Sequence, residues 1–453
     1  MAVSIDINDF LGKPIICKCG KEHKIDLKKV DIEQGAKDRI SNVINELGYK
    51  HLFVVCDVNT YEAAGKYVED NLKKNNIDFK LYVYEDKELV PDEYSCGRLF
   101  QRITKDIDLI VAVGTGTIND ICKFTSYQLG LDYIVFASAP SMDGFVSDGA
   151  ALVTDHVKTT YHAHVPVAVI GDTDILAEAP MDMIVAGLGD ILGKYTCLLD
   201  WKIANLIEDE YICDFVIDLV KNAIEACVKY GPKIKDRDKT AVQAVMEALV
   251  LSGTCMSFVG NSRPASGSEH HQSHYWEMQF QMENKKPILH GIKVGVGMIS
   301  SISMYQRLVK ETPNFEELKT LSFDYDAWKE KVIDCYKDAA TGIIALEEKA
   351  KKNDINKRNK RLDIMKNHWD EIVALINESL PKLEDMEKLM SSLNAPINPK
   401  QIGVSSKLVE DAIILAKEVR DRFTILQVLW DLNLLNDYAK LTVDYFENQQ
   451  KAY

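Results

Sequence analysis

The sequence predicts an α/β domain with a mainly parallel sheet, followed by an all-α domain. In the first third of the chain, short β-branched or aromatic apolar runs are each separated by about one helix of chain. Beyond Asp172, long segments instead repeat apolar residues at helical spacing. Strands separated by single helices imply right-handed crossovers and parallel neighbours. We therefore expect domains at residues 1–172 and 173–453.

Five apolar runs are the expected strands, and they occupy residues 52–56, 81–84, 109–113, 133–137 and 167–170. Ligands of a parallel α/β sheet bind beyond the carboxyl ends of its strands. Functional residues are therefore expected directly after these runs. In the second domain, the helical pattern is clearest over residues 211–230, 239–259 and 325–350.

Composition narrows the class of partner. The 453 residues include 69 acidic and 54 basic side chains, a formal net charge of −15. Such a chain has no general field that attracts nucleic acid or anionic lipid. No run approaches the roughly 20 apolar residues of a membrane span, and the opening MAVSIDINDF lacks the layout of a signal peptide. We expect a cytoplasmic protein with no nucleic-acid or membrane partner.

The ten cysteines are scattered, and only Cys17 and Cys19 lie close together, with His23 nearby. This spacing is not a disulfide framework. The three residues could belong to a zinc knuckle, but a closed zinc site needs a fourth ligand, and none follows at matching spacing. The expected structure is a reduced, exposed hairpin.

A strongly charged stretch, which begins EEKAKKNDINKRNKR, lies between residues 347 and 366. A run of this kind is typical of a solvated helix face or an exposed connection. No function is assigned to it.

The expected strand at residues 109–113 is followed by GTGTINDICK, residues 114–123. Two glycines permit a tight turn into a helix, whose N-terminus directs backbone N–H groups at a phosphate. The standard dinucleotide fingerprint has a third glycine where Asn119 stands. Thr117 and Asp120 could also be a helix N-cap and its N3 partner, in which case capping alone explains them.

A second loop, SAPSMDGFVSDG at residues 138–149, follows the next expected strand. Its hydroxyls, carboxylates and glycines are also ordinary turn residues. Its position beside the first glycine loop favours a ligand shared by the two loops.

Four of the ten histidines fall between His270 and His290. On a helix, His270 and His274 would share one face. A zinc protease is excluded, because His271 occupies the position that its glutamate would need. With Asp190, in AGLGDILGK, two imidazoles would form the open ligand set of a catalytic divalent metal. Taken alone, any one of these histidines is more often a hydrogen-bonded core or surface residue.

The succession GTGTINDICK, SAPSMDGFVS, AGLGDILGK, GSEHHQSH and LHGIKVGVG resembles the glycerol-1-phosphate dehydrogenases, particularly their bacterial AraM-like branch. These belong with iron-dependent alcohol dehydrogenases, glycerol dehydrogenase and dehydroquinate synthase. The resemblance extends to the KCGKEH opening and the closing AKEVRDRFTILQVLWDLNLL. It implies a dehydroquinate synthase-like fold, with a nucleotide-binding α/β domain, a helical domain and an active site in the cleft between them.

The resemblance also implies residue roles. Asp190, His270 and His290 would bind the metal, and His274, Asp143 and Asp190 would face the substrate. His274 would donate or relay a proton, a role that a near-neutral pKa suits. The residues implied to line the dinucleotide are Asp57, Gly116, Thr117, Ile118, Asn119, Asp120, Ser138, Ala139, Pro140, Ser141 and Ser147.

The implied activity is reversible reduction of dihydroxyacetone phosphate to sn-glycerol 1-phosphate, in phospholipid biosynthesis, by a homodimer. NAD(H) is expected over NADP(H), because residues 57–64 hold the acidic Asp57 and no basic partner for a 2′-phosphate. The metal would be zinc or nickel, with iron possible. Candidates for binding the substrate phosphate are Lys123, Lys194, Arg263 and Lys293.

Three alternatives remain open from the sequence. A glycerol dehydrogenase-like enzyme would act on the unphosphorylated polyol. A dehydroquinate synthase-like lyase would use the cofactor transiently, without net NADH consumption. A binding or sensing protein would retain the fold without turnover.

Overall fold

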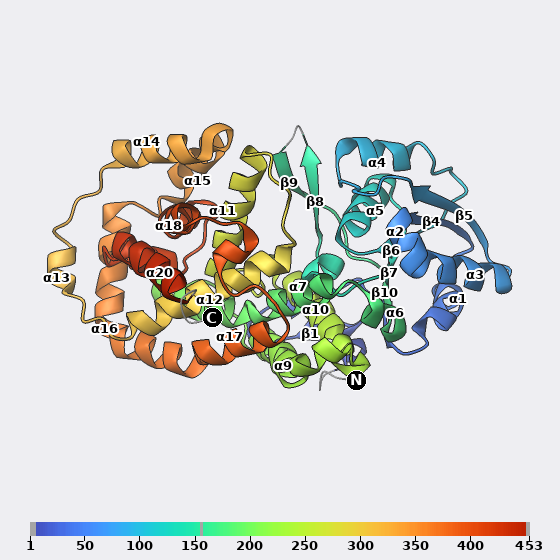
Figure 1. Ribbon diagram of the computed structural model, residues 1–453, viewed down its shortest axis with the longest axis horizontal. Helices are drawn as coiled ribbons and strands as arrows, with labels where there is room; N and C mark the ends of the chain where they lie inside the picture. Colours follow the sequence, from blue (N-terminus) through green and yellow to red (C-terminus); the bar gives the residue numbers. More distant parts are fainter. Residues whose placement is uncertain (1–5, 155–156, 450–453) are drawn as a thin grey trace. The chain divides into compact units, whose positions relative to one another are not determined.

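The computed structural model describes residues 6–154 and 157–449 (Figure 1). The chain forms two compact units. The first unit comprises Met1–Ile191 and Asp214–Ser262, and the second comprises Leu192–Cys213 and Arg263–Tyr453. The change to helical sequence after Asp172 does not coincide with this division, because several later helices pack with the α/β part of the chain.

The first unit is built on a sheet of parallel strands in the order β3-β10-β7-β6-β4-β5. Their bounds are β3 (Lys29–Glu33), β4 (His51–Asp57), β5 (Asp78–Tyr84), β6 (Leu109–Gly114), β7 (Asp132–Ala137) and β10 (Ala168–Asp172). The predicted parallel sheet is confirmed. Strand β3 was not predicted, because only alternate residues of this edge strand are buried and it forms no apolar run.

Helices cover both faces of this sheet. Helices α1 (Ala36–Leu47) and α3 (Lys66–Lys74) pack on one face, where Val54, Val111 and Phe136 belong to one buried apolar cluster. Helices α4 (Glu93–Phe100) and α5 (Gly116–Leu129) lie on the other side (Figure 1). The central strands are therefore buried on both faces, which is why they appear in the sequence as continuous apolar runs.

The order of the strands places a switch point between β4 and β6. From β4 the chain runs outward to β5, and it then returns to β6 on the opposite side of β4. From β6 it continues away through β7 to β10. The crevice at the carboxyl ends of two strands that diverge in this way is the usual ligand site of an α/β sheet.

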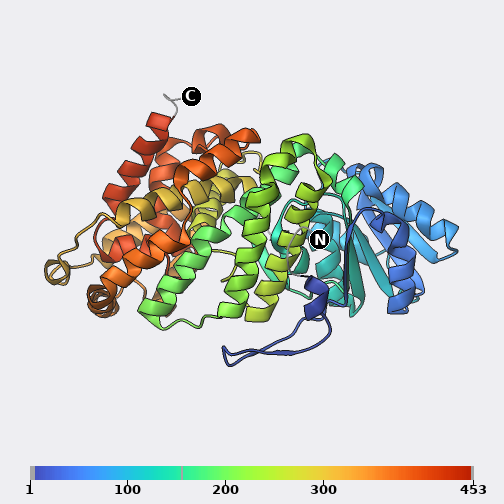
Figure 2. The same ribbon diagram turned by 90° about the horizontal axis from the view of Figure 1, so that it is seen from below.

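Two small antiparallel hairpins complete the strands of the first unit. The first joins β1 (Ile15–Ile16) to β2 (Glu22–His23), and it lies in the dark-blue N-terminal arm of Figure 2. The second joins β8 (Gly149–Thr154) to β9 (Val157–His162).

Later helices of the first unit are α6 (Thr173–Glu178), α7 (Met181–Leu192), α9 (Asp214–Tyr230) and α10 (Lys239–Val259). By length and composition, α10 could cross a membrane. However, 83% of its most apolar window is buried inside the protein. Helix α10 contacts α6 and α9, so its apolar surface is that of a core helix.

The regular elements of the second unit are all helices in its described residues. Helix α11 lies at its centre, where it contacts α8, α12 and α18. The helices are α8 (Lys194–Glu208), α11 (Ser268–Met282), α12 (His290–Leu308), α13 (Phe315–Leu318), α14 (Tyr325–Tyr336), α15 (Ala340–Ala350), α16 (Ile355–Ser379), α17 (Leu383–Ser392), α18 (Ser406–Leu415), α19 (Ile425–Asp431) and α20 (Leu435–Gln449).

The charged stretch at residues 347–366 has the expected solvated face, which includes Lys357 and Lys360, but its other side is buried. Arg361 donates two hydrogen bonds to the fully buried Asp431, at 2.6 and 2.7 Å. Lys352 lies 3.7 Å from the carboxylate of Glu418. The acids that neutralise these cations come from distant parts of the sequence, so the run alone could not reveal their burial.

We predict that Arg361→Met will destabilise the second unit by about 3–5 kcal/mol, because Asp431 would keep a buried charge without its ion-pair partner. The exposed Lys360 provides the control variant Lys360→Met. Urea unfolding followed by circular dichroism measures both. An equal midpoint for the two variants would contradict this role for the ion pair.

Candidate functional site

The glycine loop turns directly from strand β6 into helix α5. The helix begins at Gly116, and the N-cap is Thr115, whose side chain makes no capping bond. Its hydroxyl instead bonds the Ser141 hydroxyl at 2.6 Å. The alternative that Thr117 is the N-cap is therefore wrong, since Thr117 lies inside the first turn. Without a side-chain cap, the helix N-terminus presents donors suited to a phosphate.

Asn119 replaces the third glycine and joins the two loops. It is fully buried, and its amide donates to the Gly144 carbonyl at 3.3 Å. Gly114 is needed where it stands, because a Cβ there would lie 2.7 Å from the Cβ of Ile118. Asn119, which stands in place of the third glycine of the fingerprint, thus attaches the first loop to the second.

Helices α7 and α10 can lie close to the second loop because each has a glycine at the point of contact. A Cβ on Gly187 of α7 would lie 2.0 Å from the Pro140 carbonyl oxygen. A Cβ on Gly253 of α10 would lie 2.9 Å from the carbonyl oxygen of Asp143. Residues 138–147 are therefore held tightly between β7 and these two helices.

This packing brings two of the predicted carboxylates together. The backbone N–H of Asp143 donates to the Asp190 carboxylate at 3.1 Å. The Ser252 hydroxyl donates to the Asp143 carboxylate at 3.0 Å. Both aspartates are buried, so their orientation is set by these bonds.

Asp57 lies at the carboxyl end of β4, next to β6 in the sheet. Its Oδ1 atom accepts the backbone N–H groups of Asn59 and Thr60, each at 2.8 Å, and so caps the short helix α2 (Val58–Thr60). Asp57 therefore also has a structural role, as the cap of this turn. Both capping bonds use the same carboxylate oxygen.

In the second unit, three predicted histidines come together. His270 and His274 lie on α11, and His290 is the first residue of α12. The ring centroids are 5.1 Å apart for His270 and His290, and 5.9 Å apart from His274 to each of them. The Nε2 atoms of His270 and His290 are 3.2 Å apart.

The residue before His270 sets the orientation of its ring. Glu269 is fully buried, and its Oε1 atom lies 2.7 Å from Nδ1 of His270. Burial lowers the pKa of His270 well below its usual value, so the ring is neutral. With its proton on Nδ1 toward Glu269, the Nε2 lone pair faces His290. This pair of imidazoles therefore fits a divalent metal, with Glu269 as the partner that orients a ligand.

Glu269 is itself held on several sides. It accepts the backbone N–H of Gly267 at 2.7 Å and the Thr196 hydroxyl at 2.6 Å. Burial raises its pKa to about 7, with the Asp200 charge as the next cause. A Cβ on Gly297 of α12 would lie 2.5 Å from the Glu269 carbonyl, so α12 approaches only because a glycine stands there.

His274 and His271 have different surroundings. Burial lowers the pKa of His274 to about 3, opposed by a hydrogen bond with Glu277. Its ring is therefore neutral at pH 7, and the expectation of a near-neutral pKa is wrong. His271 is fully buried, and neither ring nitrogen has a hydrogen-bond partner among the described protein groups.

All four phosphate candidates are buried in the protein. Lys123 is fully buried and donates to the carbonyls of Gly144 and Gly149, at 2.7 and 3.1 Å. Arg263 lies 2.8 Å from the Glu210 carboxylate. Lys293 lies 3.3 Å from the Glu277 carboxylate. The fourth, Lys194, is fully buried, and its charge lowers the pKa of His270 after the larger effect of burial.

Arg420 is a cation that the sequence interpretation missed. Among the described residues it has no carboxylate within salt-bridge distance, and its buried Nε atom has no hydrogen-bond partner. After burial, its charge is one of the causes that lower the pKa of both His270 and His274. The signal in the sequence was the pair of arginines in AKEVRDRFT, which was read only as family resemblance.

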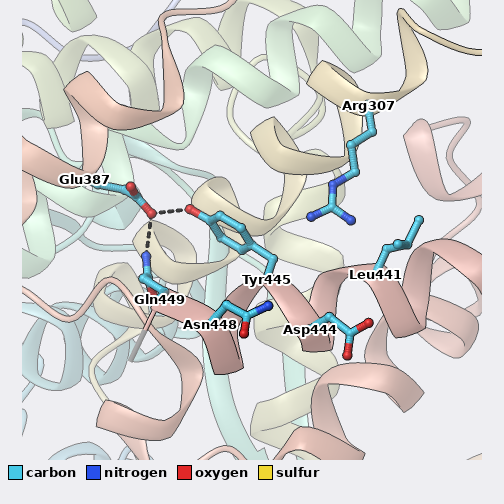
Figure 3. A pocket seen from close by; sticks show the side chains of 7 residues that line it. All are labelled: Arg307, Glu387, Leu441, Asp444, Tyr445, Asn448 and Gln449. Carbon is cyan, nitrogen blue, oxygen red and sulfur yellow. Dashed lines mark hydrogen bonds between the residues drawn. The ribbon is translucent and has the colours of Figure 1, made fainter. Parts of the chain in front are cut away.

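A pocket of about 480 Å³ also lies on the second unit (Figure 3). Within it, Glu387 accepts hydrogen bonds from Tyr445 and Gln449. The pocket is lined by Arg307, Glu387, Leu441, Asp444, Tyr445, Asn448 and Gln449. None of the predicted site residues lines it.

Comparison with known proteins identifies the family. The sequence profile of iron-containing alcohol dehydrogenases matches residues 31–180. The chain is 31% identical over 417 residues to the glycerol-1-phosphate dehydrogenase [NAD(P)+] of Halalkalibacterium halodurans, covering 91% of this chain and 95% of that protein. It is 32% identical to the enzyme of the same name from Geobacillus stearothermophilus, with coverage of 92% and 96%. The chain belongs to the glycerol-1-phosphate dehydrogenase family.

Solved structures support the fold expected of a glycerol-1-phosphate dehydrogenase. The crystal structure of glycerol dehydrogenase from Schizosaccharomyces pombe matches with a TM-score of 0.59 and 14% identity, covering 92% of this chain and 91% of that one. At this identity, the likeness concerns the fold alone. The family resemblance and the α/β plus helical architecture are both confirmed.

Proposed function

We propose that this member of the glycerol-1-phosphate dehydrogenase family reversibly reduces dihydroxyacetone phosphate to sn-glycerol 1-phosphate, using NADH and one divalent metal ion. The observation that carries the proposal is the pair of converging imidazoles. Their Nε2 atoms lie 3.2 Å apart, and Glu269 turns the His270 lone pair toward His290. Relatives that bear the dehydrogenase name cover nearly the whole chain.

Asp190 is proposed as the third metal ligand. The division between the two units falls within the last turn of α7, which carries Asp190 two residues before Leu192. Only Gly193 separates α7 from α8, and Thr196 of α8 bonds Glu269. Asp190 is therefore close in sequence to α8, whose Thr196 bonds the residue that orients His270. One carboxylate and two imidazoles suit zinc, nickel or iron.

A divalent metal bound there supplies Lewis-acid polarisation of the substrate carbonyl, which favours hydride transfer to its carbon. Asp143, oriented by Ser252, is proposed to contact a substrate hydroxyl. His274 is proposed to donate its N–H to the reacting oxygen and to relay a proton from solvent. Its neutral ring suits a relay better than a stored positive charge.

Arg420 is proposed to bind the substrate phosphate. A guanidinium with no carboxylate partner among the described residues can give its full charge to a dianion. The bonds of Lys123 to two loop carbonyls favour an architectural role for that residue instead. The Arg420 charge also acts on His270 and His274, which favours a phosphate site beside the metal.

The nicotinamide cofactor is proposed to bind along the carboxyl ends of β4, β6 and β7. The open N-terminus of α5 would receive the pyrophosphate, flanked by residues 138–141 and by Ser147. Asp57 stands on the other side of the switch point, where its carboxylate can accept hydrogen bonds from the adenosine ribose.

The decisive assay is NADH oxidation by the metal-loaded protein. Dihydroxyacetone phosphate, dihydroxyacetone and a no-substrate control are offered in parallel. We expect sustained oxidation with the phosphorylated ketone. Equal use of the two ketones would favour glycerol dehydrogenase chemistry, and no net oxidation would favour a lyase or a binding protein.

Alanine at Asp190, His270 or His290 should remove the metal and abolish turnover, because each supplies a proposed ligand atom. Elemental analysis and the NADH assay measure both effects. His271→Ala is the control, and it should retain metal and activity. Full metal occupancy in His290→Ala would show that the ligand set is wrong.

The phosphorylated ketone should be preferred over dihydroxyacetone by at least about 100-fold in kcat/KM, the effect of one or two charge-assisted contacts. Arg420→Ala should lower kcat/KM for dihydroxyacetone phosphate by about 10–100-fold and leave that for dihydroxyacetone unchanged. Arg307→Ala, at the pocket of Figure 3, is the control. A similar loss with both ketones would place Arg420 outside the phosphate site.

NADH should be preferred over NADPH, because Asp57 would repel a 2′-phosphate. Asp57→Asn keeps an oxygen for the cap of α2 and removes only the charge. It should therefore reduce the preference for NADH over NADPH, chiefly by improving the binding of NADPH. Steady-state constants for both cofactors test this. Equal or better use of NADPH by the unmodified protein would show that Asp57 does not meet the ribose.

A further inference from the structure

We propose that Cys17, Cys19, His23 and Cys213 bind a second metal ion, a structural zinc that attaches the N-terminal hairpin to the start of helix α9. Three of these residues lie in CKCGKEH, residues 17–23, for which the sequence offered no fourth ligand at matching spacing. The set of three sulfurs and one imidazole nitrogen is that of a closed, tetrahedral structural site. It is chemically distinct from the proposed catalytic set, which contains no sulfur.

The hairpin turn gathers the first three ligands. The N–H of Cys17 donates to the Lys21 carbonyl at 3.2 Å, and that of Gly20 donates to the Cys17 carbonyl at 3.1 Å. Gly20 has a φ of +85°, which makes glycine the suitable residue at this turn. As a result, Cys19 Sγ lies 3.4 Å from Nε2 of His23.

His23 is oriented as a metal ligand would be. It is fully buried, and its Nδ1 atom lies 3.0 Å from the Phe258 carbonyl oxygen, so Nδ1 carries the proton. The Nε2 lone pair is therefore directed toward Cys19. The ring also stacks on Phe215, with centroids 6.1 Å apart. A backbone carbonyl that fixes the tautomer is the usual support of a metal-bound histidine.

The start of helix α9 supplies the fourth ligand. Cys213 is bonded directly to Asp214, the first residue of α9, and Phe215 on that helix is the residue that stacks on His23. The peptide bond thus holds Cys213 at the place where the hairpin meets α9. The potential ligand atoms of the four residues all lie within 4.8 Å of one another. Zinc bonds of about 2.0–2.3 Å need only a modest contraction of this group.

The hairpin has little else to stabilise it. Its two strands have two residues each, and Ile16 is 90% exposed. A hairpin of this size is marginal in water, whereas a bound metal contributes folding free energy directly. The proposed zinc therefore stabilises the hairpin and takes no part in hydride transfer.

Cobalt(II) substitution of the full-length protein provides the primary test. Thiolate-bound cobalt gives a sulfur-to-metal charge-transfer band, which the ligand set Asp190, His270 and His290 cannot produce. The unmodified protein should show this band and bind one equivalent of thiolate-coordinated cobalt. Absence of the band would overturn the proposal without requiring any variant to fold.

Variants assign the ligands. Cys19→Ser and Cys213→Ser should each lose the band and one equivalent of zinc by elemental analysis, and His23→Ala should behave in the same way. His23→Cys should retain the ion in a four-sulfur site. Cys335→Ser, a half-buried cysteine outside the cluster, is the matched control. Full zinc content in Cys213→Ser, or a disulfide between these cysteines in the native protein, would overturn the proposal.

Asp190→Ala separates this site from the proposed catalytic metal. It should lose one equivalent of metal and all turnover, yet keep the sulfur-to-cobalt band. Loss of the band in Asp190→Ala would show that the two sites are not independent and would overturn the assignment to the hairpin. The sulfur-to-cobalt band therefore tests the hairpin site whether or not the proposed function is correct.

Discussion

The buried carboxylate of Glu269 is the group around which helices α8, α11 and α12 of the second unit are packed. It accepts hydrogen bonds from the Gly267 N–H, the Thr196 hydroxyl and the His270 ring, and these donors come from α8 and from the start of α11. Leaving such a group unsatisfied in the interior would cost several kcal/mol. Any packing of α8 and α11 that separates these donors is therefore strongly disfavoured.

Glycines make this arrangement sterically possible. A Cβ on Gly267 would lie 2.6 Å from Cα of Cys197 on α8, and a Cβ on Gly297 would lie 2.5 Å from the Glu269 carbonyl oxygen. Helices α8 and α12 can therefore close on the start of α11 from two sides. The position of His270 follows from backbone packing, so the ring is preorganised before any ligand arrives.

The first unit uses buried polar groups in a similar way. Asn119 and Lys123 both point into the second loop, where they donate to the Gly144 carbonyl. They brace the loop, so that the open N-terminus of α5 and the hydroxyls beside it keep their places at the carboxyl edge of the sheet. Arg420 in the second unit differs from these residues, because the described part of the chain gives it no carboxylate partner.

The sequence by itself determined five of the six strands of the main sheet, the glycine turn before α5 and the helix that carries His270 and His274. These depend on neighbours within one strand or one helical turn, so apolar periodicity and short motifs report them. It could not show that Lys123 is an internal brace, that Glu269 orients His270 or that the charged stretch before Lys366 is half buried. Each of these depends on a polar partner supplied by another part of the chain. Only the tertiary structure decides which distant groups meet, because the free energy of a buried charge is set by its neighbours in space and not by those in sequence.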